Sequence, residues 1–234
     1  MSATNCKNCD KPLPGQAAFC PECGQSVKAI SRPWLDALKE TLTELFDFDG
    51  RMLLSLRLLL TRPGFLTHEY INDRRISYTS PIRMYLVISL VFFFVLPMIL
   101  PDTSVASPTH TVSVDRYSKA MFLLLPLFAL LLKIFYRRIF YLSHLVFSVH
   151  LFSAMFIVFA VTLSIETTAD RYIAVAILQV VLLCYALAYC VIALRVAYGE
   201  SLLRSALKFL VILPVFLMIL GVVIELASHS EIQP

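Results

Sequence analysis

One apolar run constrains this chain more than any other feature. It extends from Tyr78 to Leu100 and reads YTSPIRMYLVISLVFFFVLPMIL, and from Ile82 onward Arg83 is its only charged residue. A helix rises about 1.5 Å per residue, so about 20 apolar residues cross a hydrocarbon core of ~30 Å. The sequence therefore predicts a first transmembrane helix here, which separates a polar N-terminal third from an apolar remainder.

The composition agrees with an all-α membrane protein. Of the 234 residues, 59% are hydrophobic and 15% are charged, whereas soluble domains have about 45–50% apolar and about 25% charged residues. The net charge is only +4, and the lysines and arginines lie mainly at the ends of apolar runs. A nucleic-acid binder would instead gather them on one polar face, so we expect the lipid bilayer, and no nucleic acid, as a partner.

Four further apolar stretches follow the first, which gives about five transmembrane helices in all. They cover residues 120–136, 142–165, 172–197 and 205–227. The first of these four is the least regular, because it contains Pro126 and ends near Lys133. A proline inside a span is tolerated where neighbouring helices satisfy the freed carbonyl group.

The basic residues predict how the helices are oriented. With a cytoplasmic N-terminus, ten basic residues flank the spans on the inner side and three on the outer side. The inner residues are Arg62, Arg74, Arg75, Arg83, Lys133, Arg137, Arg138, Arg195, Arg204 and Lys208, and the outer ones are Arg116, Lys119 and Arg171. Cytoplasmic loops carry the excess of Lys and Arg. We therefore expect a multi-pass membrane protein with its N-terminus in the cytoplasm and its C-terminus outside.

The strongest motif lies in residues 5–24, NCKNCDKPLPGQAAFCPECG, which contain two C-x-x-C pairs. The cysteines are Cys6, Cys9, Cys20 and Cys23. Four thiolates complete the tetrahedral shell of a structural Zn²⁺ ion, so we predict a small zinc ribbon. Gly24, and less favourably Asp10, follow the pairs where a positive φ is needed. No apolar leader precedes these thiols, so we expect a reducing compartment; bound iron and redox-active dithiols are the alternatives.

These features divide the chain into three predicted segments. Residues 1–30 form the zinc ribbon, residues 31–80 form amphipathic membrane-surface helices and a linker, and residues 81–234 form the five-helix transmembrane domain. In the middle segment, apolar residues recur at helical spacing from Trp34 to Phe46 and again from Arg51 to Leu60. Both stretches are too short to span a membrane. We expect them on the cytoplasmic membrane surface, with a soluble hairpin packed on the ribbon as the alternative for residues 34–61.

Four polar residues inside the apolar runs form a candidate intramembrane site: His144, His150, Gln179 and Glu225. Ionisable groups within a membrane are costly and mark functional sites by default. The two histidines are six residues apart, which places them about 120° apart around a helix. This helix alone cannot direct both at one ion, so we expect a structural role for each ring, and a shared metal or proton site is the alternative.

Outside the spans, His68 and Glu69 lie close to Arg74 and Arg75. Such a group is compatible with a catalytic or phosphate-binding cluster. A simpler interpretation is that the two arginines lie where anionic headgroups and the cytoplasmic surface favour positive charge.

Three stretches of the chain resemble a bacterial family of unknown function, domain of unknown function family 3667, over residues 5 to about 155. The stretches are NCKNCD…FCPECGQ, LLTRPGFLTHEYINDRRISYTSPIRMYLVISLVFFF and YLSHLVFSVHLFSAMF. Family members join a zinc ribbon ending in CGQ to several membrane spans. The chain departs from the family pattern where Asp73-Arg74 replaces Gly-Lys and where Phe152 replaces a third histidine. The resemblance implies a location in the bacterial inner membrane and no known activity.

The leading interpretation is a non-enzymatic adaptor or scaffold whose cytosolic zinc ribbon binds a protein partner. A small transporter or lipid-handling protein, with a path lined by His150, Gln179 and Glu225 and with a homo-oligomer as one form, is the first alternative. A membrane-embedded enzyme that uses the His68/Glu69 pair or the two intramembrane histidines is the second.

Overall fold

The computed structural model describes residues 5–14, 17–25, 27, 50–99, 114–169 and 172–229. Its described helices are α2 (Gly50–Thr61), α3 (Phe65–Ile71), α4 (Pro81–Ile99), α5 (Val114–Phe135), α6 (Tyr141–Ala169), α7 (Ile173–Tyr198) and α8 (Leu202–His229). The predicted all-α class is confirmed for these ranges. Before α2, the described residues 5–14, 17–25 and 27 form a small module, called the ribbon below, which contains an isolated antiparallel bridge between Asn5 and Pro12. The predicted helix from Trp34 to Phe46 lies outside the described residues.

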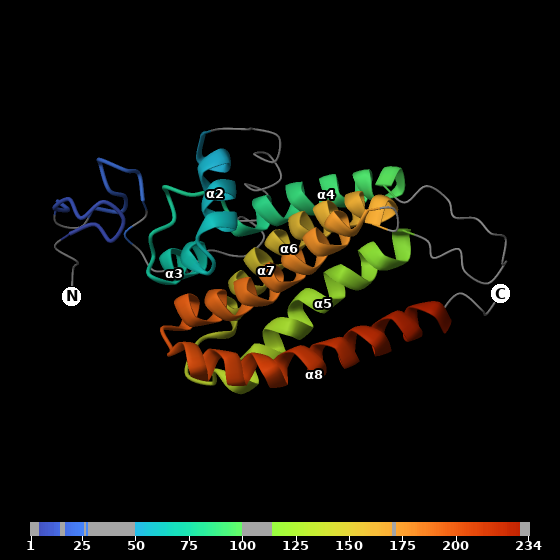
Figure 1. Cartoon of the computed structure of the whole chain (residues 1–234). Coiled ribbons are helices and arrows are strands. Elements are labelled where there is room, and N and C mark those ends of the chain that lie inside the picture. Colours follow the sequence, from blue (N-terminus) through green and yellow to red (C-terminus); the bar gives the residue numbers. More distant parts are fainter. Residues whose placement is uncertain are drawn as a thin grey trace.

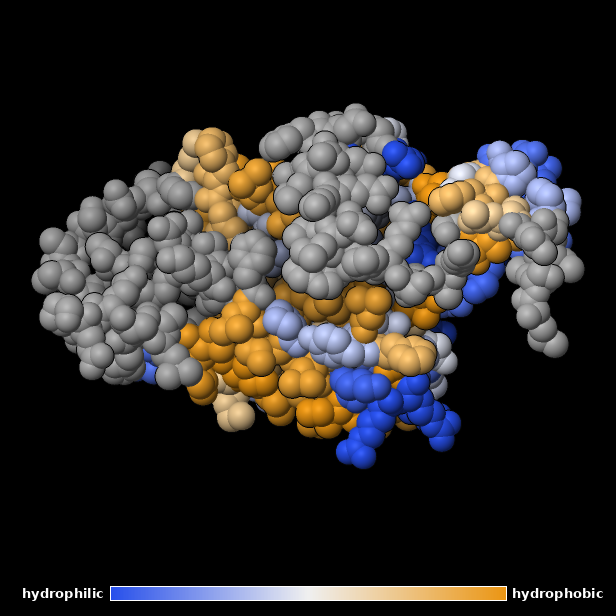
Figure 2. Space-filling view, turned by 180° about the vertical axis from the view of Figure 1, so that it is seen from behind, coloured by the Kyte–Doolittle hydropathy of each residue, from blue (hydrophilic) through white to orange (hydrophobic). Residues whose placement is uncertain are grey.

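Helices α4 to α8 alternate in direction, so the molecule has two distinct ends (Figure 1). The ribbon, α2, α3, the turn between α5 and α6 and the turn between α7 and α8 all lie at one end, which we call the ribbon end. The basic residues predicted for the inner side belong to the elements of this end. Figure 2 shows the consequence on one face: apolar surface covers the helices, and hydrophilic surface gathers toward the ribbon end.

Helix α6 is the centre of the bundle. It packs against α4, α5 and α7, and α8 packs against α5 and α7. In the apolar part of α6, 61% of the residues are buried, against 11% for α7 and 6% for α8. The outer helices therefore expose apolar side chains such as Val180, Leu210 and Met218, which is the arrangement expected where lipid surrounds a bundle.

Five spans were predicted, and three described helices are long and apolar enough to cross a membrane. These cover Tyr141–Ile165, Ile173–Tyr198 and Leu202–Val223. The other two helices exist at the expected places, but their apolar parts, Pro81–Leu96 and Leu123–Phe135, are shorter. That all five helices cross a membrane therefore stays a prediction.

The short helices α2 and α3 are attached to the bundle. Helix α2 contacts α3 and α6, and α3 contacts α6 and α7. Two tyrosines of α7 bind the end of α2: the Tyr189 hydroxyl donates to the Leu59 carbonyl at 2.6 Å, and the Tyr185 hydroxyl donates to the Leu60 carbonyl at 2.8 Å. Between α2 and α3, Gly64 lies so close to Ala193 of α7 that a Cβ atom would be 2.4 Å from its carbonyl oxygen. Contact of α2 with the lipid surface stays a prediction.

Candidate metal centre and the polar residues around it

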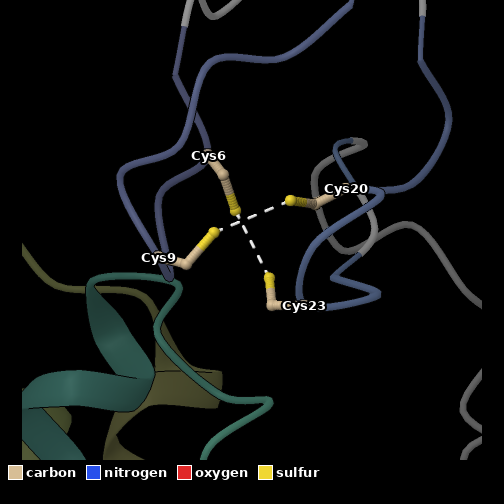
Figure 3. A group of neighbouring side chains, drawn as sticks. All are labelled: Cys6, Cys9, Cys20 and Cys23. Atoms are coloured by element: carbon tan, nitrogen blue, oxygen red, sulfur yellow. Dashed lines mark hydrogen bonds between the residues drawn. The ribbon is translucent and has the colours of Figure 1, made fainter.

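The four cysteines predicted as ligands converge on one point (Figure 3). Their sulfur atoms all lie within 4.8 Å of one another. The Sγ atoms of Cys6 and Cys23 are 3.6 Å apart, and those of Cys9 and Cys20 are 3.7 Å apart. Four sulfurs bound at about 2.3 Å to a tetrahedral zinc would lie about 3.8 Å from each other. The spacing therefore fits a four-thiolate metal centre.

The two C-x-x-C loops have the same backbone structure. In each loop the first cysteine donates its N–H to the carbonyl five residues later and accepts the N–H four residues later. These bonds join Cys6 to Lys11 and Asp10, and Cys20 to Gln25 and Gly24, at 2.8–2.9 Å. Asp10 has a φ of 58° and Gly24 a φ of 72°, which confirms the left-handed conformation predicted after each pair. Asp is one of the few residues other than Gly that adopts it.

The thiols differ in how easily they ionise. Burial disfavours the charged form of the Cys6 thiol, but the backbone N–H groups of Cys9 and Asn8 lower its pKa to about 7. The Lys11 N–H acts in the same direction on Cys9, whereas burial and the neighbouring thiols raise the pKa of Cys9 to about 12. One thiolate forms readily, and a bound cation would supply the charge that favours the others.

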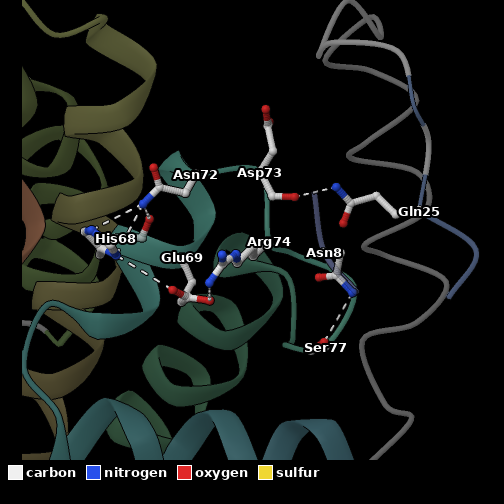
Figure 4. A network of polar contacts seen from close by, with 8 residues as sticks. All are labelled: Asn8, Gln25, His68, Glu69, Asn72, Asp73, Arg74 and Ser77. Carbon is white, nitrogen blue, oxygen red and sulfur yellow. Dashed lines mark hydrogen bonds and ion pairs between the residues drawn. The ribbon is translucent and has the colours of Figure 1, made fainter. Parts of the chain in front are cut away.

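The ribbon is attached to the loop between α3 and α4. Lys7 forms an ion pair with Asp73 at 2.6 Å, and the Gln25 side chain donates to the Asp73 carbonyl oxygen. Asn8 donates to the Ser77 hydroxyl at 3.4 Å, and Figure 4 shows the contacts of Gln25 and Asn8 on this one loop. Gln25 is only 6% exposed, so the residue directly after the second C-x-x-C-G sequence is buried by this contact.

Asp73 is the centre of this attachment. Its φ is 63°, a conformation that favours Gly and tolerates Asp, which explains how Asp can stand where the family pattern has Gly. Burial acts to raise the pKa of its carboxyl, but the bond and charge of Lys7 and the charge of Arg75 hold that pKa below its usual range. Arg75 contributes an ion pair with Asp73 at 2.8 Å. The carboxylate is therefore stabilised in its charged form between two cations.

The predicted His68/Glu69 group is part of a charge network at the end of α3 (Figure 4). Glu69 is buried and lies 3.7 Å from His68 and 3.8 Å from Arg74. Asn72 donates to the His68 carbonyl at 2.9 Å. These contacts link α3 to the loop that follows it, so each member of the group has a structural partner.

The two intramembrane histidines bind different helices. His144 is fully buried, with its Nδ1 atom 2.8 Å from the Tyr198 hydroxyl of α7. His150 is buried with its Nδ1 atom 2.9 Å from the Thr67 hydroxyl of α3. Each ring is thus fixed by its own neighbour, which agrees with the structural role expected for both.

The other two residues of the predicted intramembrane site lie elsewhere. Gln179 is near the start of α7 and half-buried, and Glu225 is exposed near the end of α8. Because α7 starts and α8 ends at the end opposite the ribbon (Figure 1), Gln179 and Glu225 lie toward that end, whereas His150 lies in the half of α6 nearer the ribbon. A path lined by these residues would have to extend along most of the bundle, and the transporter interpretation stays a prediction.

Sequence reasoning missed most partners in these contacts, among them Gln25, Thr67 and Tyr198. For Gln25 the available signal was its place directly after Cys23 and Gly24. For Thr67 the sequence offers no comparable signal, because its partner is 83 positions away along the chain. Only the folded chain shows which hydroxyl groups satisfy the buried histidines.

Comparison with known proteins places one segment of the chain. No curated protein and no solved structure matches it. A family model described as a protein of unknown function, DUF3667, matches residues 49–93. This segment includes α2, α3, the α3–α4 loop that binds the ribbon, and the first part of α4. Over residues 49–93, the resemblance to this family of unknown function stated from the sequence is thus confirmed.

Proposed function

We propose that this chain is an inner-membrane adaptor, in which a zinc-loaded ribbon on the cytoplasmic side binds a protein partner and holds it next to the bilayer. The attachment of the ribbon to the α3–α4 loop carries the proposal. Lys7, Asn8 and Gln25 fix the ribbon to a loop that leads directly into an apolar helix. A partner bound to the ribbon would therefore have a defined position relative to the membrane.

The chemistry of the metal centre favours a structural role. Four thiolates occupy all positions of a tetrahedral zinc ion, which leaves no position for water or substrate. Zinc binding supplies about 10–16 kcal/mol to the folding of comparable short modules. The ion would thus act by making the ribbon rigid, which reduces the entropy cost of binding a partner.

The ribbon also has a suitable surface. Phe19 is 54% exposed and Val27 is 37% exposed. The Val27 N–H donates to the Ala18 carbonyl at 2.9 Å, so the two apolar side chains come from neighbouring segments. Exposed aromatic side chains are frequent anchors of protein interfaces, and we assign the partner contact to this Phe19 surface.

The charge distribution supports the cytoplasmic side for the ribbon. The basic residues of α2 to α4 and of the α5–α6 and α7–α8 turns lie at the same end as the ribbon (Figure 1). An excess of Lys and Arg marks cytoplasmic loops, where the thiols also remain reduced.

Site-specific photo-crosslinking in intact cells tests the proposal. A photoreactive residue replaces Phe19 in the full chain, and the matched control carries it at the exposed Lys11 of the same ribbon. We expect a discrete adduct from position 19 that is absent from position 11 and is lost when Cys20→Ser removes a metal ligand. Equal labelling from both positions, or an adduct that persists without the metal centre, would contradict the adaptor function.

A further inference from the structure

An apolar groove runs between α7 and α8 and takes no part in the metal centre or in the Phe19 surface. Its volume is about 640 Å³. Its walls are the α7 residues between Leu187 and Ile192 and the α8 residues between Leu202 and Pro214 that face each other, and all of these lining side chains are apolar. On α8 they recur at steps of three and four positions, so they form one continuous face of the helix.

The groove has the depth of one membrane leaflet. Its α8 wall begins at Leu202, the first residue of α8 at the ribbon end, and stops at Pro214. Between these two residues the helix rises about 18 Å, and one leaflet contributes about 15 Å of the ~30 Å hydrocarbon core. The α7 wall lies in the half of α7 that leads to the same end (Figure 1). In a membrane, the groove would thus extend from the cytoplasmic interface to the middle of the bilayer.

A hollow of this size in a bilayer needs an apolar occupant. Helices α7 and α8 are both long and apolar enough to cross a membrane, so the groove between them opens to hydrocarbon. Empty space would forfeit dispersion contacts along both walls. Water is unfavourable there, because none of the lining side chains is polar.

The shape of the groove favours an acyl chain over another helix. Its volume and its length of about 18 Å together give a mean cross-section of roughly 35 Å². A helix with its side chains is about 10–12 Å across, which corresponds to roughly 80–110 Å². A helix could place only its side chains in the groove, whereas an extended acyl chain can fill it along its whole length. The small residues Ala188 on one wall and Ala206 on the other leave this space open.

The charge at the ribbon end of the groove agrees with the headgroup of an anionic phospholipid. Arg195 follows Val191 of the groove by four positions, so it lies on the same face of α7 and nearer the ribbon end. Its side chain is exposed, and no described residue forms an ion pair with it. Anionic lipids of the cytoplasmic leaflet attract basic groups at this depth. The apolar groove and the basic residue beyond it therefore match the tail and the head of one lipid.

We propose that the α7–α8 groove holds one acyl chain of an anionic phospholipid from the cytoplasmic leaflet, with its headgroup beside Arg195 and its chain end near Pro214. The proposal rests on the membrane location proposed above and adds a bound lipid to it. An occupied groove would join α7 and α8 along the half of the bundle that leads to the ribbon end.

The test uses the full-length, zinc-loaded protein in nanodiscs that contain phosphatidylglycerol with a photoreactive diazirine at a chosen carbon of the acyl chain. Ala188→Phe fills the groove from α7, and Ala206→Phe fills it from α8. The matched control is Ala174→Phe, at an exposed position near the start of α7 and outside the groove. Native mass spectrometry counts the lipids retained after transfer to detergent, and peptide mapping identifies the labelled residues.

We expect the wild type and Ala174→Phe to retain one phosphatidylglycerol per chain, and both filling variants to lose it. A diazirine near the glycerol should label residues around Leu202, and one near the methyl end should label residues around Pro214. Equal retention in the filling variants and the wild type would overturn the proposal, and so would labelling in the reverse order. The order of labelling is read in the wild type, so it remains decisive if a filling variant does not fold.

A second copy of the chain is the competing occupant. A dimer that both filling variants convert into monomers would show that a second copy covers the groove, and it would overturn the proposal as well. Crosslinking from position 19 does not involve α7 or α8, so a failure of the lipid site is distinguishable from a failure of the adaptor function.

Discussion

At the scale of single residues, the ribbon is held in place by side chains that form hydrogen bonds and ion pairs with a distant segment of the chain. Asp10 and Gly24 adopt a positive φ after the two C-x-x-C pairs, and Asp73 does so in the loop that receives the ribbon. Gln25 then reaches from the second pair to the Asp73 carbonyl. Three left-handed residues and one amide side chain thus join the metal centre to the helical bundle.

The first prediction concerns the metal. Purified protein should contain about one zinc per chain, because four converging thiols satisfy one tetrahedral ion, and Cys20→Ser should lose it. Elemental analysis after gel filtration measures the content. Cys190→Ser is the matched control, since this cysteine lies on α7 and outside the ligand group. A Cys20→Ser protein that keeps its full zinc content would show that the metal lies elsewhere.

The second prediction concerns Gln25. Replacing it by Ala removes the bond to the Asp73 carbonyl, which should weaken the attachment of the ribbon by about 1 kcal/mol and leave the zinc content unchanged. Hydrogen exchange of the α3–α4 loop should become about fivefold faster. Lys11→Ala, at an exposed position of the same ribbon, serves as the control. If the exchange rates of Gln25→Ala and Lys11→Ala were identical, Gln25 would not contribute to the attachment of the ribbon.

At the scale of the helices, close backbone approach and tyrosine hydroxyls hold α2 and α3 on α7. The α2 helix ends in carbonyl groups that need donors, and Tyr185 and Tyr189 supply them. The turn after α2 then brings Gly64 against Ala193. These contacts set the place of the loop that carries the ribbon.

Gly64→Ala tests the close approach. The new Cβ would lie 2.4 Å from a backbone oxygen of α7 at a φ of 77°, so we expect a loss of about 3 kcal/mol or more in stability. Gly199→Ala is the control, because Gly199 has a φ of 65° and nothing within 4 Å of a Cβ atom. It should lose only about 1–2 kcal/mol. Thermal unfolding in detergent compares the two, and equal losses would mean that α3 and α7 can move apart freely.

The tyrosine hydroxyls allow a second test at this scale. Tyr189→Phe leaves the buried Leu59 carbonyl without its donor, which should cost about 1–2 kcal/mol. Tyr185→Phe removes the equivalent bond at a position that is 40% exposed. Leu60 is half-buried whereas Leu59 is buried, so its carbonyl is less enclosed and the cost should be smaller. Unfolding midpoints of the two variants measure the difference. A larger effect at Tyr185 would contradict the assigned role of burial.

At the scale of the whole molecule, the two ends of the bundle differ in charge while its sides are apolar. The ribbon end collects basic residues, and α7 and α8 keep most of their apolar surface outside. Contact of these apolar side chains with water is unfavourable, whereas contact with the hydrocarbon core of a membrane is favourable. The molecule therefore has the polarity of a body that lies across a membrane with the ribbon on its basic side.

Topology reporters test this orientation. A reporter joined before the ribbon should be active only in the cytoplasm, and one joined after Pro234 only outside, because five helices of alternating direction separate the two ends (Figure 1). Positive charges retained on the cytoplasmic side are the physical reason. Two reporters active on the same side would show that one of the shorter apolar helices, α4 or α5, does not cross.

Much of the architecture could be predicted from local patterns. The spacing of Cys6, Cys9, Cys20 and Cys23 indicated one metal centre, and their sulfur atoms meet. Apolar runs indicated helices at the places of α4 to α8. That α4 and α5 cross a membrane stays a prediction, because their described apolar parts, Pro81–Leu96 and Leu123–Phe135, are shorter than a full span.

The sequence by itself determined the elements that depend on neighbouring residues: the C-x-x-C loops, the apolar helices and the basic turns. The tertiary structure alone decided which distant groups meet, such as Gln25 with Asp73, Thr67 with His150, and His144 with Tyr198. The physical reason is that chain geometry fixes contacts a few positions apart, whereas contacts between distant residues depend on how the helices pack.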